Sequence, residues 1–239
     1  SPHTPWVPLP KYRGLSKAGD YGDYAAEVDD AMGQVMRAVD AASNRNTILI
    51  FTSDNGADWK LEDLDRYAHR ANANWKGEKA DIWDGGHRIP FLIRWPNRVP
   101  AGRVSDELGC LSDLMATLAA ILGIRLPSNA AEDSYNLLPA WLGKNTKPVR
   151  PDIIHHSVDG MFAIRRGDWK LAQGLGSGGF SPPARVDPGP GGPKGQLYDL
   201  GHDPEEKNNL YQKRPDMVDS LATLLDKYKQ QGYTRPQSQ

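Results

Sequence analysis

The sequence predicts an α/β fold in which helices flank a mainly parallel sheet, followed by a smaller antiparallel sheet with one helix. An apolar, β-branched run from Asn46 to Ser53 comes directly after a helical pattern, and this alternation is typical of mainly parallel sheets. Beyond Pro151, short strand candidates separated by turn signals favour antiparallel pairing. We therefore divide the chain into residues 1–148 and 149–239.

The elements of the first part follow in order. The first fifteen residues carry four prolines, which predicts an extended segment. A helix is expected from near Asp20, because apolar residues then recur at helical spacing. These residues are Tyr24, Val28, Met32, Val35, Met36 and Val39. Two buried-type strands are predicted at 47–53 and 89–95, and a second amphipathic helix over 111–122, ended by Gly123.

The second part begins after a linker over residues 144–151. We predict strands at 152–156, 161–165, 169–172 and 196–200, joined in part by tight turns such as Asp159-Gly160. Residues 174–195 are rich in glycine and proline without periodicity, which predicts a long exposed loop. A last amphipathic helix is expected from Pro215 to Gly232.

Composition excludes several classes of function. The net charge of −1, with 25% charged residues, gives no basic footprint for nucleic acid. A single cysteine, Cys110, excludes an internal disulfide framework. No apolar run approaches the roughly 18 residues needed for a membrane span.

Asp54-Asn55-Gly56 follows directly on the first apolar strand. One reading is a turn, because Asn and Gly tolerate positive φ. The other is a metal site, because carboxylate and amide oxygens are the ligands that Ca²⁺ prefers. Two ligands do not complete a shell of about six to eight oxygens, so water or residues outside this chain would supply the others.

Two lysines and three histidines are further candidates for site residues. Lys79, in a glycine-punctuated loop ending at Gly85-Gly86, is either a plain surface lysine or a ligand for a sulfate or phosphate oxygen. Lys76 is a weaker candidate for the same role. His3, framed by prolines, is either exposed and idle or a general acid. His155 and His156, which end a predicted strand, are candidates for substrate binding beside ordinary packing and surface roles.

Several motifs together resemble the formylglycine-dependent sulfatases. They cover nearly the whole chain and occur in the order that this family uses. They are Pro2-His3-Thr4-Pro5 with Pro8, Thr52-Ser53-Asp54-Asn55-Gly56, Lys79 six residues before Gly85-Gly86-His87-Arg88-Ile89-Pro90, Leu197-Tyr198-Asp199-Leu200, and Asp203-Pro204-Glu205-Glu206-Lys207-Asn208-Asn209-Leu210. The resemblance implies an alkaline-phosphatase-like α/β core, of which residues 1–148 would be the C-terminal half, and a small C-terminal subdomain.

The resemblance also implies roles for single residues. Asp54 and Asn55 match calcium ligands, and Lys79 matches the lysine that binds a sulfate oxygen and neutralises the leaving group. His3 matches a histidine that contacts the sulfate or the leaving-group oxygen and donates a proton to it. The implied reaction is attack on sulfur by a hydrated formylglycine held on Ca²⁺. The substrate would be a sulfated small molecule or glycan, with a carbohydrate favoured by the stretch from His155 to Leu171.

Departures from the family pattern define what remains open. The family's Cys/Ser-x-Pro-x-Arg nucleophile motif lies upstream of the histidine, so we expect it from an N-terminal segment or a companion chain. Cys110 lacks the required Pro and Arg, and Ser181-Pro182-Pro183-Ala184-Arg185 falls after the other motifs, so neither is assigned that role. Asp84 replaces the usual Glu before the paired glycines, and His87 replaces a commoner aliphatic residue.

Two alternatives stay open. One is a phosphoester or phosphonate-ester hydrolase of the same superfamily, and the other is a non-catalytic fragment or binding module. We expect the isolated 239-residue chain to lack sulfatase activity, because the nucleophile must be added to it. Family habit implies a periplasmic or extracellular location.

Overall fold

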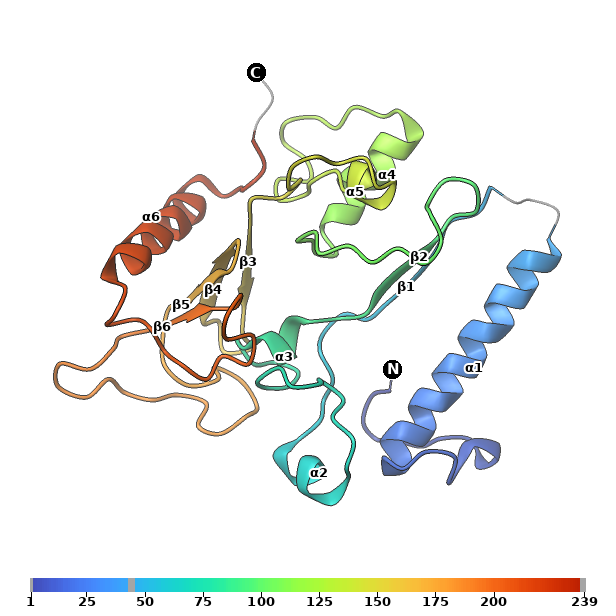
Figure 1. Ribbon diagram of the computed structural model, residues 1–239, viewed down its shortest axis with the longest axis horizontal. Coiled ribbons are helices and arrows are strands. Elements are labelled where there is room, and N and C mark those ends of the chain that lie inside the picture. The colour runs from blue at the N-terminus through green and yellow to red at the C-terminus, as the bar shows by residue number, and fades with distance from the viewer. Residues whose placement is uncertain (1, 43–45, 237–239) are drawn as a thin grey trace.

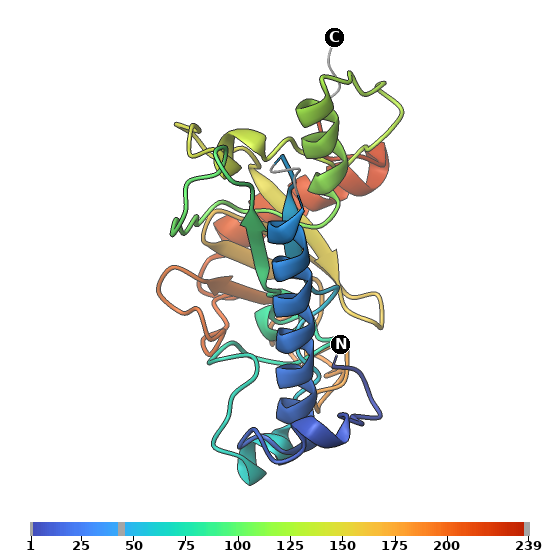
Figure 2. The same ribbon diagram turned by 90° about the vertical axis from the view of Figure 1, so that its right-hand side faces the viewer.

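The computed structural model describes residues 2–42 and 46–236, and it has the α/β character that the sequence predicts (Figure 1). A short 3-10 helix η1 (Pro10–Tyr12) precedes the long helix α1 (Gly19–Ala41). The carboxylate of Asp23 in α1 accepts hydrogen bonds from the backbone N–H groups of Gly14 and Ser16, at 2.6 and 2.8 Å. The proline-rich start is thereby fixed to the first turns of α1, which lies along one side of the molecule (Figure 2).

The two strands predicted around the candidate site are β1 (Leu49–Thr52) and β2 (Phe91–Arg94). They pair antiparallel, with Leu49 opposite Arg94 and Thr52 opposite Phe91. This corrects the mainly parallel pairing expected from the helix–strand alternation. Residues 53–90, which connect the two strands, contain only helices of six and four residues and no long crossover helix, and antiparallel strands need no crossover.

Four short helices complete the first part. Helix α2 (Leu61–Arg66) and helix α3 (Asp84–His87) lie in the segment between β1 and β2. Helix α4 (Asp113–Leu122) ends at Gly123 as predicted, and α5 (Leu138–Trp141) follows it. Arg150 then joins the two parts, because its guanidinium donates to both carboxylate oxygens of Asp113, at 3.1 and 2.8 Å. The boundary at residues 148 and 149 stays a prediction.

The second part is an antiparallel meander of four strands with one helix, as expected. The strands pair in the order β3 (Asp152–His156), β4 (Phe162–Arg166), β5 (Trp169–Ala172) and β6 (Gln196–Asp199). Helix α6 (Pro215–Gln231) covers one face. Residues 174–195 contain no helix or strand, but Ser177 in this segment is fully buried, so the predicted exposed loop is packed in part.

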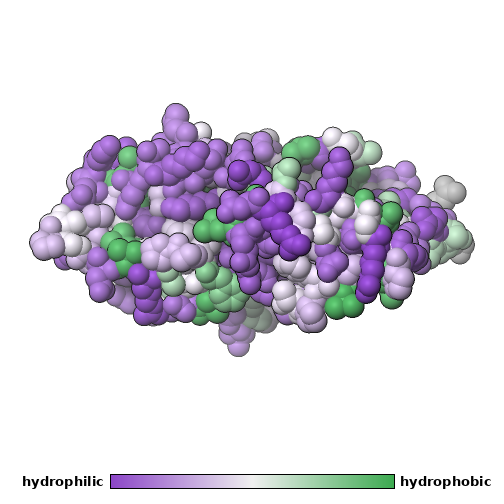
Figure 3. Space-filling view, turned by 90° about the horizontal axis from the view of Figure 1, so that it is seen from below, coloured by the Kyte–Doolittle hydropathy of each residue, from purple (hydrophilic) through white to green (hydrophobic). Residues whose placement is uncertain are grey.

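Alternation along these strands gives the sheet two apolar faces. One face packs against α6 through Ile164, Leu171, Leu197, Val218, Leu221 and Leu225. The other face packs against the segment before α3 through Ile82, Trp83, Ala163, Ala172, Tyr198 and Leu200. The segment that carries the candidate site is therefore the layer opposite α6. Seen from below, the surface of the molecule is mainly hydrophilic with separate apolar patches (Figure 3).

No helix of the described residues is both long enough and apolar enough to cross a membrane.

Candidate active site

The loop after β1 holds Asp54 and Asn55 beside the glycines that begin α3. The N–H of Gly56 donates to the carbonyl of Gly86 at 2.9 Å. A Cβ atom on Gly56 would overlap the carbonyl oxygen of Gly85, so this approach requires glycine. The Asp54-Asn55-Gly56 motif therefore does more than turn the chain: it docks onto the turn before β2.

Lys79 lies in the same assembly of loops. Its N–H donates to the carbonyl of Ala57 at 3.0 Å, and the N–H of Gly85 donates to the carbonyl of Lys76 at 2.7 Å. The side-chain amide of Asn72 accepts from the N–H of Ala57 at 2.9 Å and donates back to its carbonyl at 3.0 Å. These bonds bring the Asp54–Asn55 loop and the Lys79 loop together, as the sequence predicted.

The side chains of these residues remain available for a ligand. The Lys79 side chain is half-buried, and its ammonium makes no hydrogen bond or ion pair within residues 2–42 and 46–236. Asp54 is exposed, and its carboxylate likewise has no partner in that part of the chain. Asn55 donates through Nδ2 to the carbonyl of Gly56 at 2.9 Å, which leaves its Oδ1 free to accept.

These donors fit part of a hard-cation site. Asp54 and Asn55 offer one carboxylate and one amide oxygen, the donor types that Ca²⁺ selects. No group of three or more His, Cys, Asp or Glu residues is placed to hold a metal ion among the described residues. Two adjacent oxygen ligands would therefore form one side of a coordination shell of about six to eight.

A buried ion cluster lies behind this turn. The ammonium of Lys170, which is fully buried in β5, lies 2.8 Å from Asp84 and 2.8 Å from Glu206. The other carboxylate oxygen of Glu206 accepts the N–H of Asp84 at 2.6 Å, and Arg88 donates to Asp84 at 2.7 Å. The C-terminal part thereby holds the first residue of α3, directly before Gly85-Gly86.

The cluster sets the charge of its carboxylates. Burial alone would raise the pKa of Asp84, but Lys170 and Arg88 outweigh it and hold that pKa well below the usual range. Burial raises the pKa of Glu206, against the pull of Lys170. Asp84 is therefore the ionised partner of the buried lysine.

His87 and His155 lie against each other beside this cluster. Their ring centroids are 4.2 Å apart, and the Nε2 atom of each is buried without a hydrogen-bond partner. Burial, aided by the positive charge of Lys170, lowers the pKa of His87 to about 4 and that of His155 well below its usual value. His156 is exposed instead, and its Nδ1 lies 2.9 Å from the carbonyl of Ser157. A substrate-binding role for His155 and His156 stays a prediction.

His3 lies on the anchored N-terminal segment. Its side chain is exposed, with Nδ1 2.7 Å from the carbonyl of Thr4. Trp6 packs edge-on against Tyr21 and lies 6.4 Å, centroid to centroid, from Trp59. This ties the His3 segment to the loop that follows Asp54-Asn55. Within the described residues, no hydrogen bond or ion pair joins His3 itself to Asp54 or Lys79.

Sequence reasoning missed three buried charged residues of this region. Lys170 and Glu206 had no assigned role, although Glu206 belongs to one of the quoted family motifs. Glu78, directly before Lys79, is also buried. Burial, with help from Asp81 and Asp58, raises the pKa of Glu78 to about 7. Lys170 and Glu206 carry no local signal of this role, because each meets Asp84 from far along the chain.

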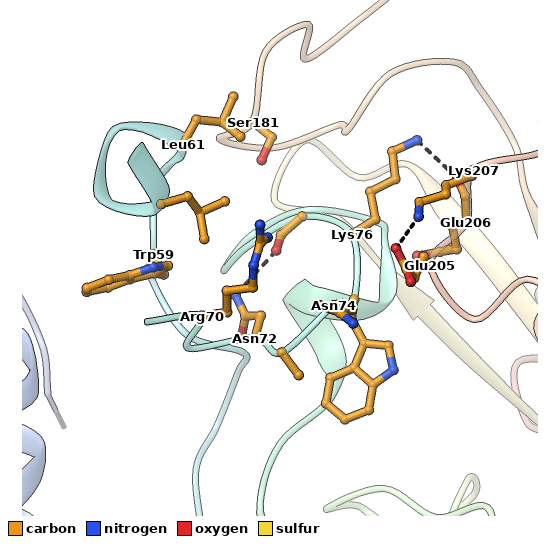
Figure 4. Close-up of a pocket in the computed structure, with 14 residues that line it drawn as sticks. Trp59, Leu61, Arg70, Asn72, Asn74, Lys76, Ser181, Glu205, Glu206 and Lys207 are labelled. Atoms are coloured by element: carbon orange, nitrogen blue, oxygen red, sulfur yellow. Dashed lines mark hydrogen bonds and ion pairs between the residues drawn. The ribbon is translucent and has the colours of Figure 1, made fainter. Parts of the chain in front are cut away.

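A pocket of about 370 Å³ opens next to the Lys79 loop (Figure 4). Trp59 and Leu61 line one side, while Lys76, Glu205 and Lys207 line the other, with Arg70 between them. Its remaining walls come from Leu64, from the rest of the segment 72–77, from Ser181 and from Glu206.

The family model described as Sulfatase matches residues 1–124, which include Asp54, Asn55 and Lys79. The chain therefore belongs to the sulfatase family. Its solved neighbours are sulfatases of the alkaline-phosphatase-like α/β fold, which confirms the predicted fold class.

Two sulfatases are similar to this chain in sequence over most of its length. The N-acetylgalactosamine-6-O-sulfatase of Bacteroides thetaiotaomicron is 35% identical over 235 residues, which is 95% of this chain and 45% of the relative. Mouse steryl-sulfatase is 31% identical over 227 residues, 87% of this chain and 36% of the relative. The chain thus spans less than half the length of these relatives.

Two solved structures agree with this. One, a 6S-sulfatase structure concerned with metabolism of multiple glycosaminoglycans by Bacteroides thetaiotaomicron, has a TM-score of 0.82 at 34% identity, with 95% of this chain and 48% of that chain covered. The other is the PsFucS1 sulfatase from Pseudoalteromonas, with a TM-score of 0.76 at 27% identity, covering 98% of this chain and 48% of that chain.

Proposed function

We propose that the gene product containing this chain hydrolyses a sulfate ester of a carbohydrate. The observation that carries this is the docking of the Asp54–Asn55 loop on the Lys79 loop, through Gly56 to Gly86 and Lys79 to Ala57. The side-chain oxygens of Asp54 and Asn55 and the ammonium of Lys79, which has no partner among the described residues, thus lie on adjacent, mutually bonded loops, and this supports the proposal. The N-acetylgalactosamine-6-O-sulfatase among the relatives supports a carbohydrate ester as the substrate.

Lys79 binds a sulfate oxygen in this proposal. Its ammonium has no competing anionic partner in the described part of the chain, so it can offset the charge that develops as the ester bond breaks. His3 donates a proton to the leaving alcohol, because its ring is exposed on a segment anchored beside the same loops. His155 and His156 are assigned to the substrate side of the site.

Asp54 and Asn55 would hold a calcium ion through their free oxygens. With such an ion and a hydrated formylglycine bound, the site gains charge neutralisation on the sulfuryl oxygens and a nucleophile. The formylglycine is expected from a segment or companion chain that carries the Cys/Ser-x-Pro-x-Arg motif. We also propose, on membership of the family alone, a periplasmic or extracellular setting, which cell fractionation tests.

The test is release of inorganic sulfate by the native gene product from 6-sulfated N-acetylgalactosamine. The matching phosphate ester serves as the competing substrate. We expect sulfate release that is lost on chelation and restored by Ca²⁺, and faster turnover of the sulfate than of the phosphate. Preference for the phosphate ester would favour the phosphoester hydrolase, and no hydrolysis of either would favour a binding module.

A further inference from the structure

The pocket drawn in Figure 4 shares part of its framework, through Asn72, with the loops of the candidate site. Asn72 lines the pocket, and its amide bonds both to Ala57 and, at 3.3 Å, to the carbonyl of Gly77. Ala57 in turn accepts the N–H of Lys79. The pocket wall is therefore joined through Asn72 and Ala57 to the backbone of Lys79, so the pocket lies beside the loop that carries Lys79.

The carboxylates of the pocket are already neutralised. Glu206 binds the buried Lys170 and accepts the N–H of Asp84. Glu205 forms an ion pair with Lys207 at 2.5 Å. Each carboxylate thus already has a cation at ion-pair distance.

Two cations of the pocket lack an anionic partner. The ammonium of Lys76 donates to the carbonyl of Glu206 at 3.3 Å and lies 4.0 Å above the ring of Trp83, but no carboxylate lies within 4.0 Å of it in the described ranges. Partial burial lowers the pKa of Lys76 and outweighs the opposing effect of the Glu206 and Asp203 charges. The guanidinium of Arg70 has neither a hydrogen bond nor an ion pair in the same ranges.

The rest of the lining suits a sugar ring. Leu61 is 58% exposed and Trp75 is 36% exposed, which gives apolar surface. Asn74 is exposed beside them, and its amide has no partner among the residues that the structure describes. Apolar walls with a few polar groups and a charged residue are the usual make-up of a small-molecule site.

We propose that this pocket is a second subsite, which binds an anionic group on the sugar next to the one whose ester is cleaved. Arg70 is its specificity-determining residue, because a guanidinium can hold a carboxylate or a sulfate with two hydrogen bonds. Lys76 adds a second positive charge. This inference rests on the proposed function and extends it to the neighbouring sugar of the substrate.

The test compares three disaccharide substrates with the same sulfate ester. The neighbouring sugar carries a carboxylate in the first, a second sulfate in the second and no charge in the third. Arg70→Ala should raise KM by roughly tenfold or more for one or both charged substrates and leave KM for the neutral one and kcat unchanged. Which charged substrate responds identifies the anionic group. The matched control is Arg66→Ala, because Arg66 is an exposed arginine outside the pocket, and this variant should leave KM for all three substrates unchanged.

Equal changes for charged and neutral substrates, or none, would overturn the subsite. Arg70→Lys should recover part of the lost affinity, since it keeps the charge but not the paired hydrogen bonds. Calorimetric titration with the two charged disaccharides lacking the ester separates the two proposals. Arg70-dependent binding without hydrolysis of any ester would refute the proposed function alone, whereas hydrolysis without dependence on Arg70 would refute the subsite alone.

Discussion

The buried cluster behind α3 gives the sharpest prediction about stability. In Lys170→Met, the fully buried ammonium that lies 2.8 Å from both Asp84 and Glu206 is removed. Removing one partner from a buried ion cluster typically costs about 3–5 kcal/mol, because the remaining charge is left uncompensated in a poorly solvated place. Folded domains are stable by about 5–15 kcal/mol, so the loss would be a large fraction of the total.

Urea unfolding followed by tryptophan fluorescence measures this change. Glu206→Gln should lower the free energy of unfolding by less, roughly 1–3 kcal/mol. The amide oxygen of the new side chain still accepts the N–H of Asp84, and Lys170 keeps Asp84 as a partner. Lys194→Met, at an exposed lysine, is the control and should stay within about 0.5 kcal/mol. A loss below about 1 kcal/mol in Lys170→Met would refute the reasoning.

Three further predictions concern the site loops and pH. Gly56→Ala should lower calcium affinity and stability, because its methyl group displaces the Gly85 carbonyl; unchanged calcium titration would contradict this. Burial raises the pKa of Glu78 to about 7, above its unfolded value of 4.5, so stability is lost as pH rises between these values. Glu78→Gln should therefore stabilise by up to about 3 kcal/mol at pH 8 and little at pH 4, and an equal effect at both would count against it. Burial lowers the pKa of His87 to about 4, so stability is lost as pH falls from 6.5 towards 4. In His87→Leu, the melting temperature should fall less between pH 6.5 and pH 4 than it does in the unchanged protein. An equal fall in both would exclude His87 as the cause of the acid-induced loss of stability.

Local patterns predicted most elements of the fold. The four strands of the second sheet and helix α6 were found because alternation, tight turns and helical spacing are properties of a few neighbouring residues. Helices α2 and α3 were missed, since six and four residues are too short to show a helical period. The antiparallel pairing of β1 with β2 was missed because apolar strands read alike in either direction. The prediction that both strands are buried was wrong, since Phe91 and Leu92 in β2 are 37% and 58% exposed.

The candidate site was predicted in part. Asp54, Asn55 and Lys79 were chosen from their position after a strand and in a glycine-rich loop, and the hydrogen bonds of Gly56 and Lys79 bring those loops together. Lys170 and Glu206 could not be found, because they meet Asp84 from 86 and 122 residues away in sequence. Long-range charge pairing of this kind leaves no local pattern.

The proposed hydrolysis is tested most directly by comparing Lys79→Ala with Lys60→Ala in the native gene product. Release of sulfate from 6-sulfated N-acetylgalactosamine is measured for both variants at saturating Ca²⁺. Removing a group that stabilises developing charge commonly lowers kcat by a factor of about 10²–10³, so kcat of the Lys79→Ala variant should fall by that factor. Lys60, exposed at the start of α2, should keep at least about half of the activity when replaced. Equal losses in the two variants, or full activity in Lys79→Ala, would contradict the assignment of Lys79 and the site built around it.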